Sequence, residues 1–225
     1  MSSNTAPAVA AARASASATS ASAASSSTAS ALPSCTPIQR RILGCLRVFL
    51  GEQAAPLYDA HGRSLQRLAA FCRDSSLPGC QELSTGLALA QALLAEAMSS
   101  APVFDSPAAV TDFLKLHFAG QAYESFVVVF LDARHQLIVV EDVFRGTLTQ
   151  TSVYPREVLK RALHHNAAAV ILAHNHPSGS TDPSRADEVL TETLRSTLSL
   201  IDVRVLDHLV VAGTRSMSFA ERGLL

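Results

Sequence analysis

The chain has 225 residues, of which 48% are hydrophobic and 16% are charged, and its formal net charge is -1. This length accommodates either one large domain or one domain with an appended segment. A net charge so close to zero gives the protein no overall positive potential that would attract nucleic acid. The longest apolar runs have the length of a strand, which predicts no membrane span. Four cysteines without CxxC spacing, and no secretory signature, favour reduced thiols and the cytoplasm.

Residues 1–36 are predicted to be a disordered Ala/Ser-rich tail. Residues 1–33 are almost entirely Ala, Ser and Thr, and Arg13 is their single charged side chain. Such a segment has little large apolar surface to offset the entropy of ordering it. A transit peptide is the alternative, because the segment is rich in Ser and Ala and poor in acids, but one arginine makes no amphipathic face.

Residues 37–100 are predicted to be a small helical segment. Apolar residues recur at helical spacing over 42–50, 64–72 and 87–98, which indicates three helices. The arginines of this segment are interpreted as a solvated helix face. Residues 99–107 contain Pro102 and Pro107, which is typical of a linker.

Residues 102–225 are predicted to be a compact α/β domain. An amphipathic helix is expected over 107–118, a strand buried on both faces over 126–131 and a returning strand over 137–143. Pro155 suits the first position of a helix that continues to residue 165. A helix with an apolar stripe over 186–198 and strands at 203–206 and 208–212 complete a mixed sheet flanked by helices.

His174 and His176 follow a short apolar strand, residues 170–173. Successive side chains of a strand point to opposite faces, so the two imidazoles leave one face and Asn175 leaves the other. Ser184 is suited to cap the next helix, and Asp187 falls in its first turn. Two imidazoles, one carboxylate and a vacant fourth position suit a catalytic zinc, whereas calcium or magnesium requires more oxygen ligands.

An alternative remains open for these residues. Ser184 and Asp187 also fit the [ST]-x-x-[DE] helix-capping pattern, and a histidine at a strand end is often bonded to backbone.

The order His-x-His-Pro, Ser, and Asp three residues after that Ser matches the JAMM (MPN+) metalloprotease motif. The form HNHPSG, with PREV before it and RVLDHLVV and SFAERG after it, resembles the RadC family. The resemblance covers residues 102–225 and implies an MPN domain with a cytidine-deaminase-like fold. It also implies that His174, His176 and Asp187 hold zinc.

The resemblance further assigns two catalytic residues. JAMM proteins place a glutamate at the start of an earlier core strand, and Glu124 occupies that position before FVVVFL. Glu124 would take a proton from the attacking water and pass it to the leaving amine. Ser184 would hydrogen-bond the oxyanion or the water. Glu141 and Asp142 are the reserve candidates for the base.

RadC proteins usually carry a helix-hairpin-helix module where residues 37–100 lie here. At Leu77-Pro78-Gly79-Cys80-Gln81 the second glycine of the expected Gly-x-Gly turn is replaced by Gln81, whose side chain obstructs a phosphate. The module is therefore predicted to be degenerate. Asp207 and His208 also match the RadC pattern but are interpreted as structural residues outside the site.

The function predicted from the resemblance is zinc-dependent hydrolysis of an amide or isopeptide bond in an unidentified polypeptide. The alternative is a DNA repair or recombination accessory protein, which uses the MPN domain as a scaffold and associates weakly with DNA. A nucleobase deaminase is disfavoured because the H-x-E and P-C-x-x-C signature is missing. No membrane partner is expected, and a homodimer is left open.

Overall fold

A computed structural model describes residues 35–103, 107–146 and 153–225. Contacts within the chain separate residues 1–35 from residues 36–225, and the helices and strands given below belong to the second unit. The predicted tail, up to residue 34, lies outside the described residues, as do residues 104–106 of the predicted linker. No helix in the described ranges is both long enough and apolar enough to cross a membrane.

The helical segment holds four α-helices and one 3₁₀ turn. They are α1 (Pro37–Leu50), η1 (Gly51–Gln53), α2 (Ala54–Ala60), α3 (Leu65–Asp74) and α4 (Cys80–Ser100). Thr36 caps α1 in a reciprocal capping box, and the Ser64 hydroxyl accepts the Arg67 amide hydrogen at the start of α3. The three predicted helices are present as α1, α3 and α4. The prediction missed α2 and started α4 at residue 87 instead of Cys80.

Gly79 precedes α4 with a φ of 84°, in the left-handed region that favours glycine. A Cβ on this residue would lie 1.9 Å from the carbonyl oxygen of Phe49 near the end of α1. The turn over residues 77–81 therefore packs against backbone, and this contact is sufficient reason for its glycine.

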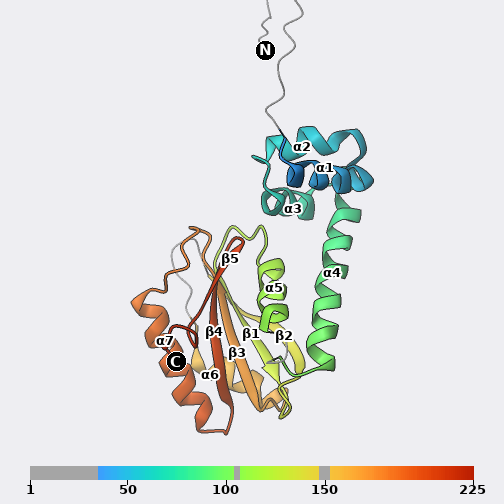
Figure 1. Ribbon diagram of the computed structural model, residues 1–225. Coiled ribbons are helices and arrows are strands. Elements are labelled where there is room, and N and C mark those ends of the chain that lie inside the picture. The colour runs from blue at the N-terminus through green and yellow to red at the C-terminus, as the bar shows by residue number, and fades with distance from the viewer. Residues whose placement is uncertain (1–34, 104–106, 147–152) are drawn as a thin grey trace, which may run out of the picture. The chain divides into compact units, whose positions relative to one another are not determined.

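The second part of the chain forms a five-stranded sheet with helices (Figure 1). Its elements are α5 (Pro107–His117), β1 (Ser125–Leu131), β2 (Leu137–Arg145), α6 (Pro155–His164), β3 (Ala169–Asn175), α7 (Arg185–Ser199), β4 (Arg204–Ala212) and β5 (Arg215–Ser218). The strand order is β2-β1-β3-β4-β5. β3 and β4 are parallel, and the other three pairs are antiparallel, so the predicted mixed sheet is confirmed.

The sheet is the middle of three layers. Val127 and Val129 of β1 pack in a core with α4 and α5, whereas Phe126 and Phe130 pack in a second core with α6 and α7. Figure 1 shows these two helix pairs on opposite faces of the sheet. All seven residues of β1 are buried, as its continuous apolar run predicted.

The end of the sheet differs from the prediction. The segments 203–206 and 208–212 are one strand, β4, in which the pairing with β3 shifts register between Val170 and Ile171. The sequence predicted an interruption because the polar residue Asp207 divides the apolar run, but the strand continues through it. β5 was not predicted, because a strand of four residues that begins with Arg215 lacks an apolar run.

Candidate metal centre

His174 and His176 lie at the end of β3, with the edge of one imidazole ring directed at the other. The two Nε2 atoms are 3.0 Å apart. Asp187, in the first turn of α7, places Oδ1 3.6 Å from His174 Nε2 and Oδ2 3.8 Å from His176 Nε2. The structure thus brings together the three residues that the sequence predicted as metal ligands, with their ligand atoms within 4.8 Å of one another.

These distances suit a tetrahedral zinc ion. Ligands at roughly 2.0–2.1 Å from a tetrahedral zinc lie about 3.3 Å from each other, within the range observed between the three side chains. His176 Nδ1 lies 2.9 Å from the carbonyl oxygen of Ser180. A carbonyl only accepts, so Nδ1 carries the hydrogen, and the Nε2 of the neutral ring has a free lone pair. The donor set therefore fits a metal.

His174 is buried, with 6% of its surface exposed. Burial lowers the pKa of His174 to about 4, and His176 acts in the same direction, while Asp187 opposes the shift. The ring is consequently neutral at physiological pH, which is the form that binds a metal.

Asp187 is held by the cap of α7. The Ser184 hydroxyl donates to Asp187 Oδ2 over 2.6 Å, and the Ser184 amide donates to the same oxygen over 2.7 Å. The Ser184 hydroxyl also accepts from the Asp187 amide at 3.2 Å, which completes a capping box. The two alternatives left open by the sequence therefore coexist: the carboxylate that caps the helix also faces the imidazoles.

Glu124 precedes β1 and approaches the same group of side chains. Its Oε1 lies 4.0 Å from His176 Nε2, and its side chain is 32% exposed. Asn175 fixes the backbone on both sides of Glu124, because its Oδ1 accepts from the Ser125 amide at 2.7 Å and its Nδ2 donates to the Tyr123 carbonyl at 2.9 Å. The sequence placed Asn175 on the opposite face of the strand but assigned it no contact.

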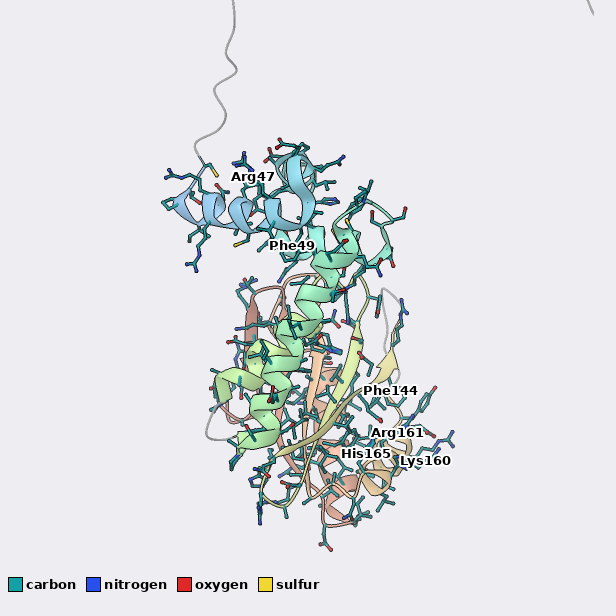
Figure 2. All side chains as sticks on the ribbon, turned by 90° about the vertical axis from the view of Figure 1, so that its right-hand side faces the viewer. Arg47, Phe49, Phe144, Lys160, Arg161 and His165 are labelled. Carbon is teal, nitrogen blue, oxygen red and sulfur yellow. The ribbon has the colours of Figure 1, made fainter. Side chains whose placement is uncertain are left out.

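The two reserve carboxylates are engaged elsewhere. Glu141 on β2 lies 2.8 Å from His165 Nε2 and 3.4 Å from Arg161 Nε. β2 is an edge strand of the sheet, and Figure 2 labels Arg161 and His165 of the α6 region beside it. Asp142 lies 3.0 Å from His117 Nε2. Glu124 is thus the upstream carboxylate that lies within 4.0 Å of a proposed ligand.

His208 matches the RadC pattern, and the sequence predicted a structural role for it outside the site. This residue of β4 is fully buried, and its Nε2 lies 2.8 Å from His174 Nδ1. Burial lowers its pKa well below the usual range. His208 thus contacts a proposed ligand directly, which the sequence did not predict. A histidine inside an otherwise apolar strand was the available signal, but only the pairing of β3 with β4 shows which ring it meets.

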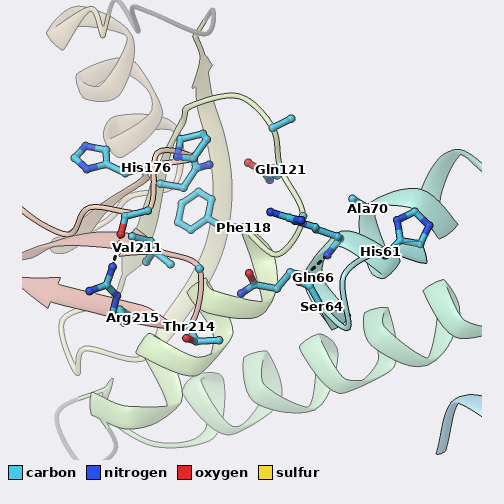
Figure 3. A pocket seen from close by; sticks show the side chains of 18 of the residues that line it. His61, Ser64, Gln66, Ala70, Phe118, Gln121, His176, Val211, Thr214 and Arg215 are labelled. Carbon is cyan, nitrogen blue, oxygen red and sulfur yellow. Dashed lines mark hydrogen bonds between the residues drawn. The ribbon is translucent and has the colours of Figure 1, made fainter. Parts of the chain in front are cut away.

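A cleft of about 940 Å³ opens beside His176. Its lining includes Arg67 from α3, Gln121 from the loop before β1, and Arg215 from β5. Figure 3 shows Gln121, His176 and Arg215 around this space. The cleft therefore reaches the candidate metal centre from the side of the β4–β5 hairpin.

Residues 104–224 match the family described as RadC-like JAB domain. The chain belongs to this family. The resemblance to RadC proteins seen in the sequence is therefore confirmed, and the three-layer arrangement around a mixed sheet is consistent with a JAB fold.

Relatives of this RadC-like chain include several proteins named UPF0758 protein. The protein of Variovorax paradoxus (strain S110) is 63% identical over 144 residues, which are 64% of this chain and 64% of that protein. The protein of Nitrosomonas eutropha (strain DSM 101675 / C91 / Nm57) is 52% identical over 172 residues, which are 73% of this chain and 77% of that protein. The chain spans less than two thirds of the length of the Variovorax relative.

Proposed function

We propose that this RadC-like protein is a zinc-dependent hydrolase that cleaves an amide or isopeptide bond in a polypeptide. One observation carries the proposal. Two imidazoles and one carboxylate converge within 4.8 Å, and a second carboxylate, that of Glu124, lies 4.0 Å from His176. Three ligands and a separate base are what a catalytic zinc site requires.

His174, His176 and Asp187 would hold the ion. A zinc ion bound there would lower the pKa of a bound water to about 7 and would polarise a carbonyl oxygen. Both imidazoles have hydrogen-bond partners on Nδ1. Their Nε2 atoms face each other and the Asp187 carboxylate. This orientation supports binding of the cation through Nε2.

Glu124 would act as general base and then as general acid. Its carboxylate is partly exposed and close to His176, so it can take a proton from the attacking water and return it to the leaving amine. A positioned carboxylate of this kind contributes roughly 10²–10⁴-fold to the rate. Asn175 supports the role by holding the backbone before and after Glu124.

Ser184 would stabilise the oxyanion. Its hydroxyl hydrogen is directed at Asp187 Oδ2, so donation to an oxyanion requires the hydroxyl to rotate away from this carboxylate. An oxyanion donor lowers the barrier by about 2.7–4 kcal/mol, which is comparable to or larger than the net stability of about 1.5–3 kcal/mol expected for a hydrogen bond to a charged group.

The cleft beside His176 is the proposed binding site for the polypeptide substrate. Among the described residues that line it, Arg67 and Arg215 are charged and none is an aspartate or glutamate. We therefore expect a preference for a segment with acidic side chains. Matched libraries of acidic and basic peptides, compared by mass spectrometry, test this expectation.

Metal analysis tests the centre, and two variants separate binding from chemistry. The wild-type protein should hold close to one zinc per chain, and Asp187→Ala should lose it. Glu124→Gln should retain zinc and lose hydrolysis, because the amide keeps the volume of the side chain without a basic oxygen. Equal zinc content in the wild type and Asp187→Ala would contradict the proposed metal centre. Full activity of Glu124→Gln would show that Glu124 is not the general base.

The alternative of a DNA repair or recombination accessory is not favoured by a specific observation in the described residues. Its test uses the exposed arginines of α1: Arg40, Arg41 and Arg47. If this face binds DNA, the affinity of the full chain for a labelled duplex should fall steeply with salt, and replacing all three residues with Gln should flatten that slope. A homodimer and a cytoplasmic location also stay predictions; light scattering during size-exclusion chromatography tests the first.

A further inference from the structure

We propose that His208 and Thr191 are positioning residues that fix the tautomer of His174, with the hydrogen on Nδ1 and the lone pair of Nε2 directed at the metal position. The inference deepens the proposed function and depends on the same centre. It rests on a buried chain of hydrogen bonds that starts at the backbone of one proposed ligand, Asp187, and ends on the ring of another.

The direction of the chain is set by Thr191 of α7. Its Oγ1 lies 2.6 Å from the carbonyl oxygen of Asp187. A carbonyl carries no hydrogen, so the single hydroxyl hydrogen of Thr191 must lie between these two oxygens. Without it, two lone pairs would oppose each other at this distance. The Thr191 hydroxyl can therefore only accept from its other neighbour.

That neighbour is His208. Its Nδ1 lies 2.6 Å from Thr191 Oγ1, so it must donate, and in the neutral ring Nε2 then has no hydrogen. His208 Nε2 is 2.8 Å from His174 Nδ1 and accepts from it. The remaining nitrogen of His174, Nε2, then carries no hydrogen. Neither does His176 Nε2, 3.0 Å away, because the hydrogen of that ring lies on Nδ1 toward Ser180. The two lone pairs repel each other across the gap, and a cation bound between them would remove this repulsion.

No solvent competes for these bonds. His208 is 0% exposed and Thr191 is 2% exposed. The His208 ring is stacked on Phe219, with centroids 4.7 Å apart, and packs edge-on against Phe126 at 5.5 Å. The apolar rings offer no alternative partner to the nitrogens of His208. The bond to Thr191 therefore decides the tautomer of His208.

This arrangement predicts a specific effect of removing one hydroxyl. In Thr191→Val, the side chain keeps its volume, but His208 Nδ1 loses its acceptor and the two tautomers of His208 are no longer distinguished. His174 should then populate both tautomers in the metal-free protein. Zinc affinity should fall by about 10–100-fold, the range found for residues that orient metal ligands. Thr191→Ser should restore both properties.

The experiment is long-range ¹H–¹⁵N NMR on protein labelled at histidine, together with zinc titration against a chelator. Thr197→Val is the matched control, because the Thr197 hydroxyl makes the same backbone bond on α7, 2.7 Å to the carbonyl of Thr193. The wild type and the control should show His174 with hydrogen on Nδ1. Circular dichroism checks that each variant is folded.

Two results would overturn the inference: an Nε2–H tautomer of His174 in the metal-free wild type, or unchanged tautomer and zinc affinity in folded Thr191→Val. The test is independent of hydrolysis. A wild-type protein that has the Nδ1–H tautomer and binds zinc, but cleaves no peptide, would support the positioning roles and count against the proposed function alone.

Discussion

The side chain of Asn175 accepts the backbone hydrogen of Ser125 over 2.7 Å, although the two residues belong to different strands of the sheet. The side-chain Nδ2 of Asn175 also donates to the Tyr123 carbonyl oxygen, so one side chain holds the backbone on both sides of Glu124. Asn175 is 4% exposed, and water cannot replace these bonds. The end of β3 therefore supplies two proposed ligands and also positions the proposed base.

Asn175→Ala should reduce hydrolysis more than it reduces zinc binding. Loss of a buried acceptor leaves the Ser125 amide unpaired, which costs about 1–3 kcal/mol in the free energy of unfolding. The backbone around Glu124 should then relax, while His174 and His176 keep their own contacts. Urea denaturation, zinc content and turnover of the same preparation measure the three effects. Unchanged turnover in a variant that binds zinc would contradict the role of Asn175.

Ser184→Ala should weaken both the fold and the metal site. Loss of a helix cap costs about 0.5–2 kcal/mol, and Asp187 Oδ2 loses its hydroxyl donor. Ser196→Ala, on the exposed face of the same helix, removes a hydroxyl that bonds only a surface glutamate at 3.2 Å among the contacts described. We expect the control to match the wild type in melting temperature and zinc affinity. Equal behaviour of the two variants would exclude a structural role for the cap.

Gly79→Ala and Gly86→Ala test why the turn before α4 contains glycine. A Cβ at Gly79 would collide with the Phe49 backbone at 1.9 Å and the residue has positive φ, whereas a Cβ at Gly86 would lie 3.5 Å from the Phe49 ring. The first variant should be destabilised by several kcal/mol, on the order of the larger effects of single mutations. The second should be stabilised by roughly 0.5–1 kcal/mol, because alanine favours a helix. Calorimetry of both variants provides the comparison.

The metal-free protein should lose stability as the pH falls from 6.5 toward 5. Burial lowers the folded-state pKa of His174 to about 4 and lowers that of His208 as well. In this window the unfolded chain binds protons that the folded chain excludes, so acid favours unfolding. Each imidazole contributes a slope of at most about 1.4 kcal/mol per pH unit. Denaturation at several pH values should show a smaller slope for His208→Gln, and an equal slope would contradict the assignment.

The sequence predicted the parts of the fold that local patterns determine. The apolar run before Asp132 predicted β1, and Pro155 and Ser184 predicted where α6 and α7 begin. A helix cap depends on residues within one turn, and a buried strand depends on residues within that strand. Both can therefore be predicted from a short stretch of sequence. The interruption predicted in β4 was wrong, because an irregular pairing with β3 is invisible in the sequence of a single strand.

The same distinction applies to the site. The convergence of His174, His176 and Asp187 could be predicted because they belong to one short stretch with a recognisable spacing. The contacts of His208 and Asn175 could not be predicted, since they join residues 34 and 50 positions apart. Such contacts depend on which strands are neighbours, and the sheet order is a property of the whole chain.

The proposed metal ligands and the histidine behind them all come from one β–α–β unit, β3, α7 and β4, whereas Glu124 belongs to a different strand connection. The residues proposed to hold the ion and the residue proposed to react with the bound water thus belong to separate segments. Under the proposed function, a relative without an acid at position 124 would still hold the ion and bind peptides, but it would not cleave them.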